Sequence, residues 1–429
     1  MAKPVIQPAA VVTSVILTQS KMVPAAGSGV LAPRRFHRWW AVPLAALGVL
    51  LALLPLVFSF VPSTAFVDKA RCVERNDKNE CTKRVDEPVE FGLVPAEAQP
   101  VEPRVSITGV PSYPSDGQIY FVTITEPNIS MVDWFVTRQN KAARMLSHHD
   151  KYGDQTEQQL TSSGQVQMRS AKDNAMYVAL KAAGYPVELM PGQVIVDQLL
   201  CLEADAANQC TKSSPADDLL DPGDVLTKVD GATITIGEDL GAVLKNHEPG
   251  DKIKIEFTRA GEPMSGTITT ILAPGEDPPR TIIGFRPVDT TTVKLPEGLH
   301  VQLKTDEIGG PSAGLAFTLT LIDELTPGDL MGGQRVAVTG TIDVEGHVGA
   351  IGGLNSKASA VLQTGVKYFL VPASQKDQPY PDNIIAAQQV VGSDVQIIPV
   401  ATLEEALAGL EKIGGDPVQL AVPPTETTV

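Results

Sequence analysis

An uncharged stretch near the N-terminus constrains the fold of this chain more than any other feature. From Trp39 to Val61 there are 23 residues without a charged side chain, rich in Leu, Ala and Val. A helix of roughly 20 apolar residues crosses the ~30 Å hydrocarbon core of a bilayer. Residues 1–38 hold five basic side chains and no acidic one. The positive-inside rule therefore predicts a transmembrane helix over residues 39–61, with a cytoplasmic N-terminus and the rest of the chain outside the plasma membrane.

A cleaved signal peptide is the alternative interpretation of this stretch. The apolar core of a signal peptide is usually about 7–15 residues long, and no small-x-small cleavage site follows the stretch here. We therefore expect an uncleaved single-pass anchor, preceded by a disordered cytoplasmic tail over residues 1–38. A translation start at Met22 would shorten that tail and leave the same anchor.

The charge of the remaining chain limits the class of partner. Of the 34 basic residues, 29 follow residue 38, where all 50 acidic residues also lie, giving this part a net charge of −21. So acidic a surface argues against a nucleic-acid partner and suits domains outside the cell.

The four cysteines form two pairs of identical spacing, Cys72 with Cys81 and Cys201 with Cys210. Neither pair is a CxxC and no histidine pair lies near either, so we expect no zinc site and no other metal. Two local disulfides in an oxidising compartment are the better explanation, although four cysteines allow three connectivities.

Residues 62–184 predict a mixed α/β region next to the membrane. Its first part, residues 62–100, is polar and Pro-rich and predicts an irregular stalk. Val105–Thr108 and Gln118–Thr125 alternate like the two strands of a hairpin.

Two helices are expected in the second part of that region, over Asn128–Ser147 and Thr156–Ala183, the latter closed by Gly184. His148–Asp150 lies between them. Three consecutive residues of a regular element cannot all face one ion, so this segment predicts a solvated loop.

A module in the middle of the chain begins with Asp-Pro-Gly-Asp-Val-Leu-Thr-Lys-Val-Asp-Gly at residues 221–231, which predicts a turn, a strand and a second turn. A short helix over Leu240–Asn246 follows, then a hairpin of Lys252–Thr258 with Gly266–Ile271. Over residues 185–275 this pattern resembles the PDZ family of bacterial secreted and membrane proteases. The resemblance implies that an extended peptide binds as an additional strand, with its C-terminal carboxylate in a backbone nest.

The same resemblance implies that the carboxylate-binding loop comprises Pro191, Gly192 and Gln193 and leads into Val194. The second cysteine pair would then hold a loop inserted before the 221–231 signature. The alternative is a PDZ-type spacer that binds no ligand, because a fold alone does not determine a function.

Residues 309–314, Gly-Gly-Pro-Ser-Ala-Gly, run directly into an apolar stretch over 315–322. This pattern predicts a loop that leads into a buried helix with Pro near its first turn. Ser312 would lie where backbone N–H groups point outward and the helix dipole favours negative charge. An oxyanion formed at such a serine would find hydrogen-bond donors. Considered alone, the motif is more typical of an N-capping serine at the start of a core helix.

Two downstream motifs change that interpretation: Thr339-Gly340, within a predicted strand, and Ile351-Gly352-Gly353-Leu354-x-x-Lys357, which opens a helix. In this order and spacing, the three motifs resemble the proteolytic domain of Lon proteases, over residues 280–415. With the anchor and the PDZ module, the chain resembles the membrane-anchored, PDZ-containing Lon-like proteases of Gram-positive bacteria, especially actinobacteria. Many Lon enzymes carry an Asp three residues before the serine, where this chain has Gly309.

The resemblance implies a Ser–Lys dyad in which Ser312 is the nucleophile and Lys357 the general base, with the Thr339 hydroxyl bound to the lysine. The supporting residues of the nucleophile loop are Gly310, Pro311, Ala313 and Gly314. A lysine normally titrates near pH 10.4, and both burial and a helix N-terminus lower its pKa. His347 is the only histidine nearby, and we expect it in a turn rather than in a triad.

The expected fold is a multi-domain α+β chain, and the expected function is a membrane-anchored serine endopeptidase acting on extracytoplasmic proteins or peptides. No Gly-x-x-x-x-Gly-Lys-Ser/Thr occurs, so we expect neither ATP nor another cofactor. The family resemblance also suggests homo-oligomers. The alternative function is a catalytically silent scaffold that binds envelope partners.

Residues 416–429 predict a disordered tail that ends in Thr427-Thr428-Val429. A Thr two residues before a terminal Val is typical of PDZ ligands. The tail could therefore occupy the PDZ groove of its own chain or of a neighbour; the alternative is a chance match in an unused tail.

Overall fold

The structure, a computed structural model, describes residues 41–75, 81–113, 115–153, 155–204, 210–273, 279–305 and 308–418. Its contacts divide the chain into two units, Met1–Leu53 and Leu54–Val429. The tail predicted over residues 1–38 lies outside the described residues, and so does the predicted C-terminal tail beyond Val418, including its Thr-Thr-Val end.

Helix α1, Ala41–Phe58, occupies most of the stretch in which we predict a membrane span. It is 18 residues long, carries no charged side chain and contains Pro55. Its large apolar side chains are exposed, from Val42 to Phe58. No helix in the described ranges reaches the length and apolarity needed to cross a bilayer. The span over residues 39–61 therefore stays a prediction.

A seven-stranded sheet forms the centre of the second unit. Its strand order is β1-β2-β4-β17-β20-β21, with β5 also paired to β2. β4, β17, β20 and β21 are parallel to one another, whereas β1, β2, β4 and β5 are joined by antiparallel pairs. The bounds are β1 Asp68–Arg75, β2 Cys81–Pro100, β4 Gln118–Thr125, β5 Arg144–Ser147, β17 Arg335–Val338, β20 Tyr368–Pro372 and β21 Gln396–Val400.

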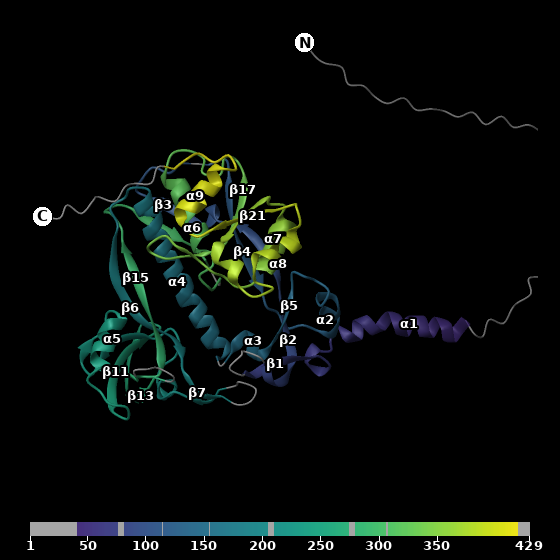
Figure 1. The fold of residues 1–429 in the computed structure, drawn as a ribbon, viewed down its shortest axis with the longest axis horizontal. Helices are drawn as coiled ribbons and strands as arrows, with labels where there is room; N and C mark the ends of the chain where they lie inside the picture. The colour runs from purple at the N-terminus through teal and green to yellow at the C-terminus, as the bar shows by residue number, and fades with distance from the viewer. Residues whose placement is uncertain are drawn as a thin grey trace, which may run out of the picture. The chain divides into compact units, whose positions relative to one another are not determined.

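Helices cover both faces of this sheet because its central strands bury side chains on both faces. In β4, Ile119 and Phe121 belong to one hydrophobic core, and Tyr120 and Val122 belong to another. Successive side chains of a strand point to opposite faces. The first core contains α4, α6 and α9 and the second contains α7 and α8 (Figure 1). The helices span α4 Glu157–Ala182, α6 Gly314–Leu325, α7 Leu354–Thr364, α8 Ile384–Val391 and α9 Leu403–Glu411.

This arrangement corrects the prediction of a separate region over residues 62–184. Four of the seven strands and helix α4 come from that region and share the sheet and core with residues predicted as the domain 280–415. Residues 62–100, predicted as an irregular stalk, contain β1 and β2. The signal was the alternation of Val89, Phe91 and Leu93, all of which are buried. Prolines in this stretch are tolerated because strands accept them at edges and bulges.

The strands predicted over residues 105–108 and 118–125 have those bounds in the structure, as β3 and β4. The predicted hairpin between them is wrong. β3 pairs with β16, His300–Leu303, and β4 lies between β2 and β17. β3 and β4 each pair with strands that are distant in sequence. The alternation of residues within a strand does not indicate which strand it pairs with.

The helix predicted over residues 128–147 is also wrong in its extent. α2 covers only Met131–Thr137, where Ser130 and Asp133 form a capping box. β5 then occupies Arg144–Ser147 and pairs with β2. The apolar residues predicted as one helix are thus divided between the helix α2 and the strand β5.

The helix predicted over residues 156–183 is confirmed as α4, with Thr156 as its N-cap. His148–Asp150, predicted as a loop, instead begins the short helix α3, His148–Tyr152. Ser147 caps that helix by accepting a hydrogen bond from the Asp150 backbone N–H.

A second sheet contains the residues predicted as a PDZ domain over 185–275. Its order is β12-β11-β9-β6-β15, with β10 paired to β9, and the buried Leu240 and Leu244 of helix α5, Gly237–Leu244, pack on its core. β15 pairs with β6 along a long ribbon (Figure 1), so the sheet extends beyond the predicted boundary. The bounds are β6 Glu188–Leu199, β9 Val225–Val229, β10 Ala232–Thr233, β11 Lys252–Arg259, β12 Glu262–Thr269 and β15 Phe285–Lys294.

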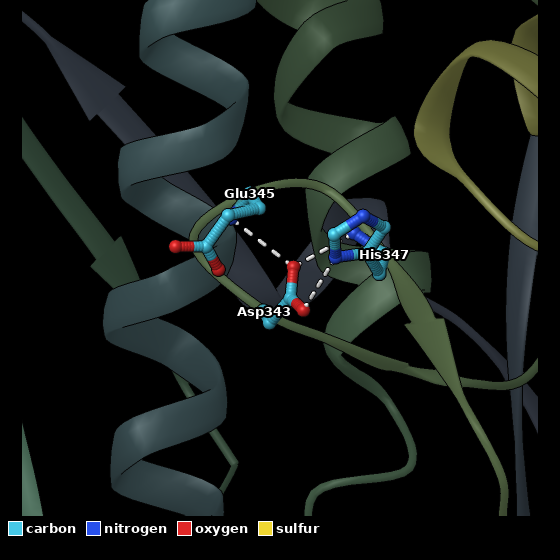
Figure 2. Close-up of side chains that lie close together, drawn as sticks. All are labelled: Asp343, Glu345 and His347. Atoms are coloured by element: carbon cyan, nitrogen blue, oxygen red, sulfur yellow. Dashed lines mark hydrogen bonds and ion pairs between the residues drawn. The ribbon is translucent and has the colours of Figure 1, made fainter.

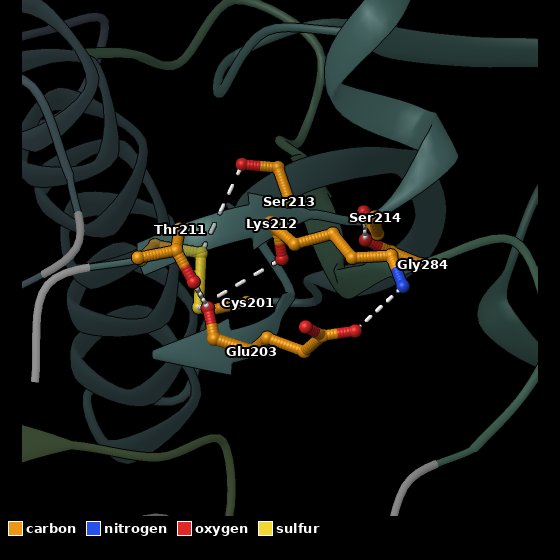
Figure 3. The surroundings of a disulfide bond; sticks show 8 residues. Cys201, Glu203, Thr211, Lys212, Ser213, Ser214 and Gly284 are labelled. Carbon is orange, nitrogen blue, oxygen red and sulfur yellow. Dashed lines mark hydrogen bonds and ion pairs between the residues drawn. A yellow bond between two sulfur atoms is a disulfide. The ribbon is translucent and has the colours of Figure 1, made fainter. Parts of the chain in front are cut away.

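Both predicted disulfides are present, Cys72–Cys81 and Cys201–Cys210, with S–S distances of 2.11 and 2.10 Å. The second joins β7, Cys201–Ala204, to β8, Cys210–Ser213 (Figure 3). The remaining pairs are short: β13 Ile271–Leu272 with β14 Thr281–Ile282, and β18 Thr341–Ile342 with β19 Val348–Gly349.

Candidate active site

Ser312 lies in the loop before α6, and the sequence around it explains this position. Gly310 has φ +84°, a conformation that favours glycine. Gly314 begins α6, and a Cβ there would lie 3.1 Å from Ile342 Cγ2 and 3.2 Å from Ile342 N. Glycine thus lets the helix start close to β18. The core residues of α6 then fix the helix, and the loop with it.

Lys357 lies in the first turn of α7 and is almost fully buried. Its Nζ is 2.7 Å from Ser312 Oγ and 3.2 Å from Thr339 Oγ1. Thr339 Oγ1 in turn donates to the Ser312 carbonyl oxygen at 3.2 Å. The three residues that the sequence analysis grouped from three separate motifs are therefore in mutual contact.

Burial lowers the pKa of Lys357 from its ordinary 10.5 to about 8. Desolvation penalises the charged form of an amine, so a buried lysine loses its proton more readily. No carboxylate forms an ion pair with Lys357 in the part of the chain that the structure describes. With a pKa of about 8, roughly a tenth of the amine is neutral at pH 7 and about half at pH 8.

Asp382 positions the helix that carries Lys357. One of its carboxylate oxygens accepts from the backbone N–H groups of Gly353 and Leu354, at 2.7 and 3.2 Å. The other oxygen pairs with Arg144 at 3.0 Å. No local capping motif reveals Asp382 in the sequence, because it caps α7 from 28 residues beyond Leu354.

Backbone donors lie beside the serine. The N–H groups of Ser312 and Ala313 have no acceptor among the described residues. By contrast, the N–H of Gly340 donates to the Ser312 carbonyl oxygen at 2.9 Å, which holds the loop against the residues that join β17 to β18. Two free N–H groups at the start of a helix form a suitable site for a developing negative charge.

The serine opens into a cleft of about 660 Å³. Pro311, Ala313 and Lys357 line it together with apolar side chains of other elements. Those apolar residues are Phe121, Val122, Ile124, Met168, Ile308 and Ile351. The cleft thus brings a serine hydroxyl and a buried lysine amine together beside an apolar surface.

His347 lies outside this constellation and just after the turn at Val344–Glu345 rather than in it, in an isolated β-bridge with Thr402. Its Nδ1 is 2.9 Å from Asp343 Oδ2, and Asp343 Oδ1 accepts from the N–H groups of Glu345 and His347 (Figure 2). The side chains of these three residues lie close enough together to hold a metal ion. The two hydrogen bonds that Asp343 accepts from the backbone close the turn, and this structural role explains its position without a metal ion.

The predicted carboxylate-binding loop at Pro191, Gly192, Gln193 and Val194 is wrong, because these residues lie inside β6. A Cβ at Gly192 would lie 2.1 Å from the Thr290 carbonyl oxygen, and Gln193 N donates to Thr290 Oγ1 at 3.0 Å. Val194 is fully buried between β9 and β15.

Among the described strands this sheet ends in β12, which pairs only with β11, and in β15, which pairs only with β6. Gly284, immediately before β15, has φ +104°. The N–H groups of Ile283 and Gly284 have no acceptor within the described residues. The turn at Ile283–Gly284 thus leaves two backbone N–H groups next to the edge strand β15.

Two family models match this chain. Residues 291–410 match the Lon protease (S16) C-terminal proteolytic domain, and residues 184–270 match the PDZ domain. These matches support a serine peptidase with a PDZ domain.

Lon proteases match this chain over its protease domain. The Lon protease of Neorickettsia sennetsu is 38% identical over 110 residues, covering 25% of this chain and 12% of the relative. That of Escherichia coli K12 is 37% identical over 111 residues, covering 25% and 13%. That of Azospirillum brasilense is 35% identical over 129 residues, covering 30% and 15%. The chain thus spans a small part of the length of these relatives.

Among solved structures, the PDZ domain of an SdrC-like protein from Listeria monocytogenes is 20% identical with a TM-score of 0.19, covering 23% of this chain and 90% of that one. A second, from Geobacillus thermodenitrificans, is 19% identical with a TM-score of 0.18, covering 22% and 97%.

Proposed function

We propose that this chain is a serine endopeptidase in which Ser312 is the nucleophile and Lys357 the general base. The observation that carries the proposal is the 2.7 Å contact between Lys357 Nζ and Ser312 Oγ in a buried site. A serine hydroxyl is a weak nucleophile and needs an adjacent base. A lysine whose pKa burial lowers to about 8 can act as that base without a histidine.

The reaction follows from this geometry. Neutral Lys357 Nζ takes the proton of Ser312 Oγ while Oγ bonds to the peptide carbonyl carbon. The carbonyl oxygen becomes an oxyanion beside the free N–H groups of Ser312 and Ala313. Lys357 then gives its proton to the leaving amine as the C–N bond breaks. Water attacks the resulting ester with Lys357 again as base, which restores the serine.

Thr339 orients the lysine in this scheme. Its hydroxyl hydrogen is directed to the Ser312 carbonyl oxygen, so its lone pairs face Lys357 Nζ. An acceptor in this position steadies the ammonium that forms in each half-reaction. Because Thr339 is fully buried, water does not compete for its hydrogen bond to Lys357.

The peptidase acts outside the plasma membrane, anchored by residues 39–61, and without ATP. The charge-free stretch, the basic residues before it and the acidic chain after it support this orientation. The two disulfides support an oxidising compartment. The PDZ domain takes an extended peptide on the free edge of β15 and presents it or regulates the enzyme.

Cleavage of an unfolded protein tests this function. The purified full-length chain should degrade β-casein at the same rate with and without ATP and Mg²⁺, whereas the matched Ser312→Ala variant should leave it intact. Gel electrophoresis and mass spectrometry of the fragments measure both rates. Cleavage by Ser312→Ala would refute the nucleophile, and a wild-type chain that cleaves nothing but binds peptides would indicate a scaffold instead.

A further inference from the structure

The middle of helix α4 contacts the nucleophile loop. The carbonyl oxygen of Gly164 accepts the Gly310 N–H at 2.8 Å. A Cβ at Gly164 would lie 3.6 Å from both Gly309 Cα and Gly310 N. Glycine is among the least favourable residues in a helix interior, so its presence here indicates a backbone approach that larger side chains would block. The two glycines before Pro311 thus rest directly on α4.

The preceding residue of α4 contacts the PDZ sheet. Ser163 Oγ donates to Asp197 Oδ1 at 2.6 Å, and both residues are buried. Asp197 is the extra residue of a β-bulge, since Gln198 pairs with Arg286 while Val196 pairs with Pro287. Bulges redirect side chains, and this one directs a carboxylate from β6 to α4.

The bulge also connects Asp197 to the edge strand. Arg286 Nη2, on β15, lies 3.4 Å from Asp197 Oδ2. That oxygen makes no hydrogen bond within the described residues. A buried carboxylate without enough partners is costly, so Asp197 depends on Ser163 and on the exposed Arg286. A contiguous set of contacts therefore leads from β15 through Asp197 and Ser163–Gly164 to Gly310.

We propose that Ser163 and Gly164 are positioning residues for Ser312, which couple the β6–β15 ribbon of the PDZ domain to the nucleophile loop. Asp197 holds Ser163, and Gly164 holds the Gly310 amide two residues before Ser312. This contact sets the direction of the Ser312 and Ala313 N–H groups. The inference rests on the proposed catalytic role of Ser312.

A matched pair at residue 164 tests this coupling in the full-length chain. Gly164→Ala adds a methyl group at ordinary contact distance, whereas Gly164→Leu pushes the Gly309–Gly310 backbone away. With a short internally quenched peptide, Gly164→Leu should lower kcat about tenfold or more with KM within about twofold, because small misplacements of reacting groups are costly. Gly164→Ala should retain wild-type kcat. Equal losses in both variants, or a loss in neither, would overturn the proposal.

Residue 163 provides a second pair should Gly164→Leu not fold. Ser163→Ala removes the hydroxyl that joins Asp197 to α4 and should lower kcat, whereas Ser163→Thr keeps the hydroxyl and should restore it. An unchanged kcat in Ser163→Ala, or no recovery in Ser163→Thr, contradicts the coupling.

Hydrogen exchange of the Gly310 amide separates a failure of this inference from a failure of the proposed function. Faster exchange in Ser163→Ala than in Ser163→Thr and wild type supports the coupling even if no peptide is cleaved. Equal exchange in all three chains refutes the coupling even if Ser312 proves to be the nucleophile.

Discussion

Replacing Lys357 by Met is expected to lower kcat/KM by about 10²–10⁴, because Ser312 loses its base. Methionine has a similar length and no charge, so it fills the same buried space. Arginine provides the matched control: Lys357→Arg keeps a cation but cannot act as a neutral base at any working pH. Both variants should therefore show this loss against peptide and casein. An active Lys357→Met variant would remove the lysine from the mechanism.

The same substitution is expected to stabilise the fold near neutral pH. The wild-type chain buries an amine whose pKa falls from 10.5 to about 8, a penalty of about 3 kcal/mol that methionine avoids. The unfolded chain binds more protons between these pH values, so wild-type stability rises with pH through this window. The advantage of Lys357→Met should be full below about pH 8 and should vanish toward pH 10.5. Thermal melts across this range measure it.

A fragment of residues 280–418 is expected not to fold, although it contains Ser312, Thr339 and Lys357. In this fragment β17 loses its partner β4, and α6 loses helix α4. Each buried aliphatic side chain left without a partner costs about 1.5–3 kcal/mol, and α4 alone contributes Ala175, Val178, Ala179 and Leu180 to the core. That deficit is comparable to the whole stability of an ordinary domain, about 5–15 kcal/mol.

Circular dichroism and thermal melts of this fragment measure the effect, with residues 62–418 as the control that retains the whole sheet. The longer fragment should unfold cooperatively and the shorter one should show no transition. A cooperative transition in residues 280–418 would mean that the proteolytic domain is continuous in sequence.

The candidate site could be predicted from sequence because its chemistry resides in short motifs. Ser312, Thr339 and Lys357 each belong to a local motif, and the resemblance of the three motifs to the Lon proteolytic domain implied a role for each residue. The structure brings their side chains within 3.2 Å. Asp382 and Gly164 were missed because each acts on a backbone distant in sequence. Gly164 left one signal, a glycine inside an otherwise well-capped helix.

The fold was less predictable for a related reason. The bounds of β3 and β4 follow from local alternation, but their partners do not, because strand pairing depends on long-range packing. In β2, charged residues and prolines masked the alternation of Val89, Phe91 and Leu93. The predicted PDZ domain ended at residue 275, but β15, which follows that boundary, pairs with β6 and adds an edge strand to the sheet. An edge strand needs only one partner, so a segment outside the expected range can provide it.

The pH dependence of kcat/KM tests the Ser312–Lys357 dyad most directly. With a short peptide, kcat/KM should fall about tenfold for each pH unit below about 8 and level off above it, because only the neutral amine accepts the serine proton. Burial also raises the pKa of Asp323 to about 6 and that of Glu324 to about 7, both on α6. Asp323→Asn and Glu324→Gln should therefore retain the rise near pH 8. A profile that is flat between pH 7 and 9, or that falls as pH rises, would contradict a neutral lysine as the base.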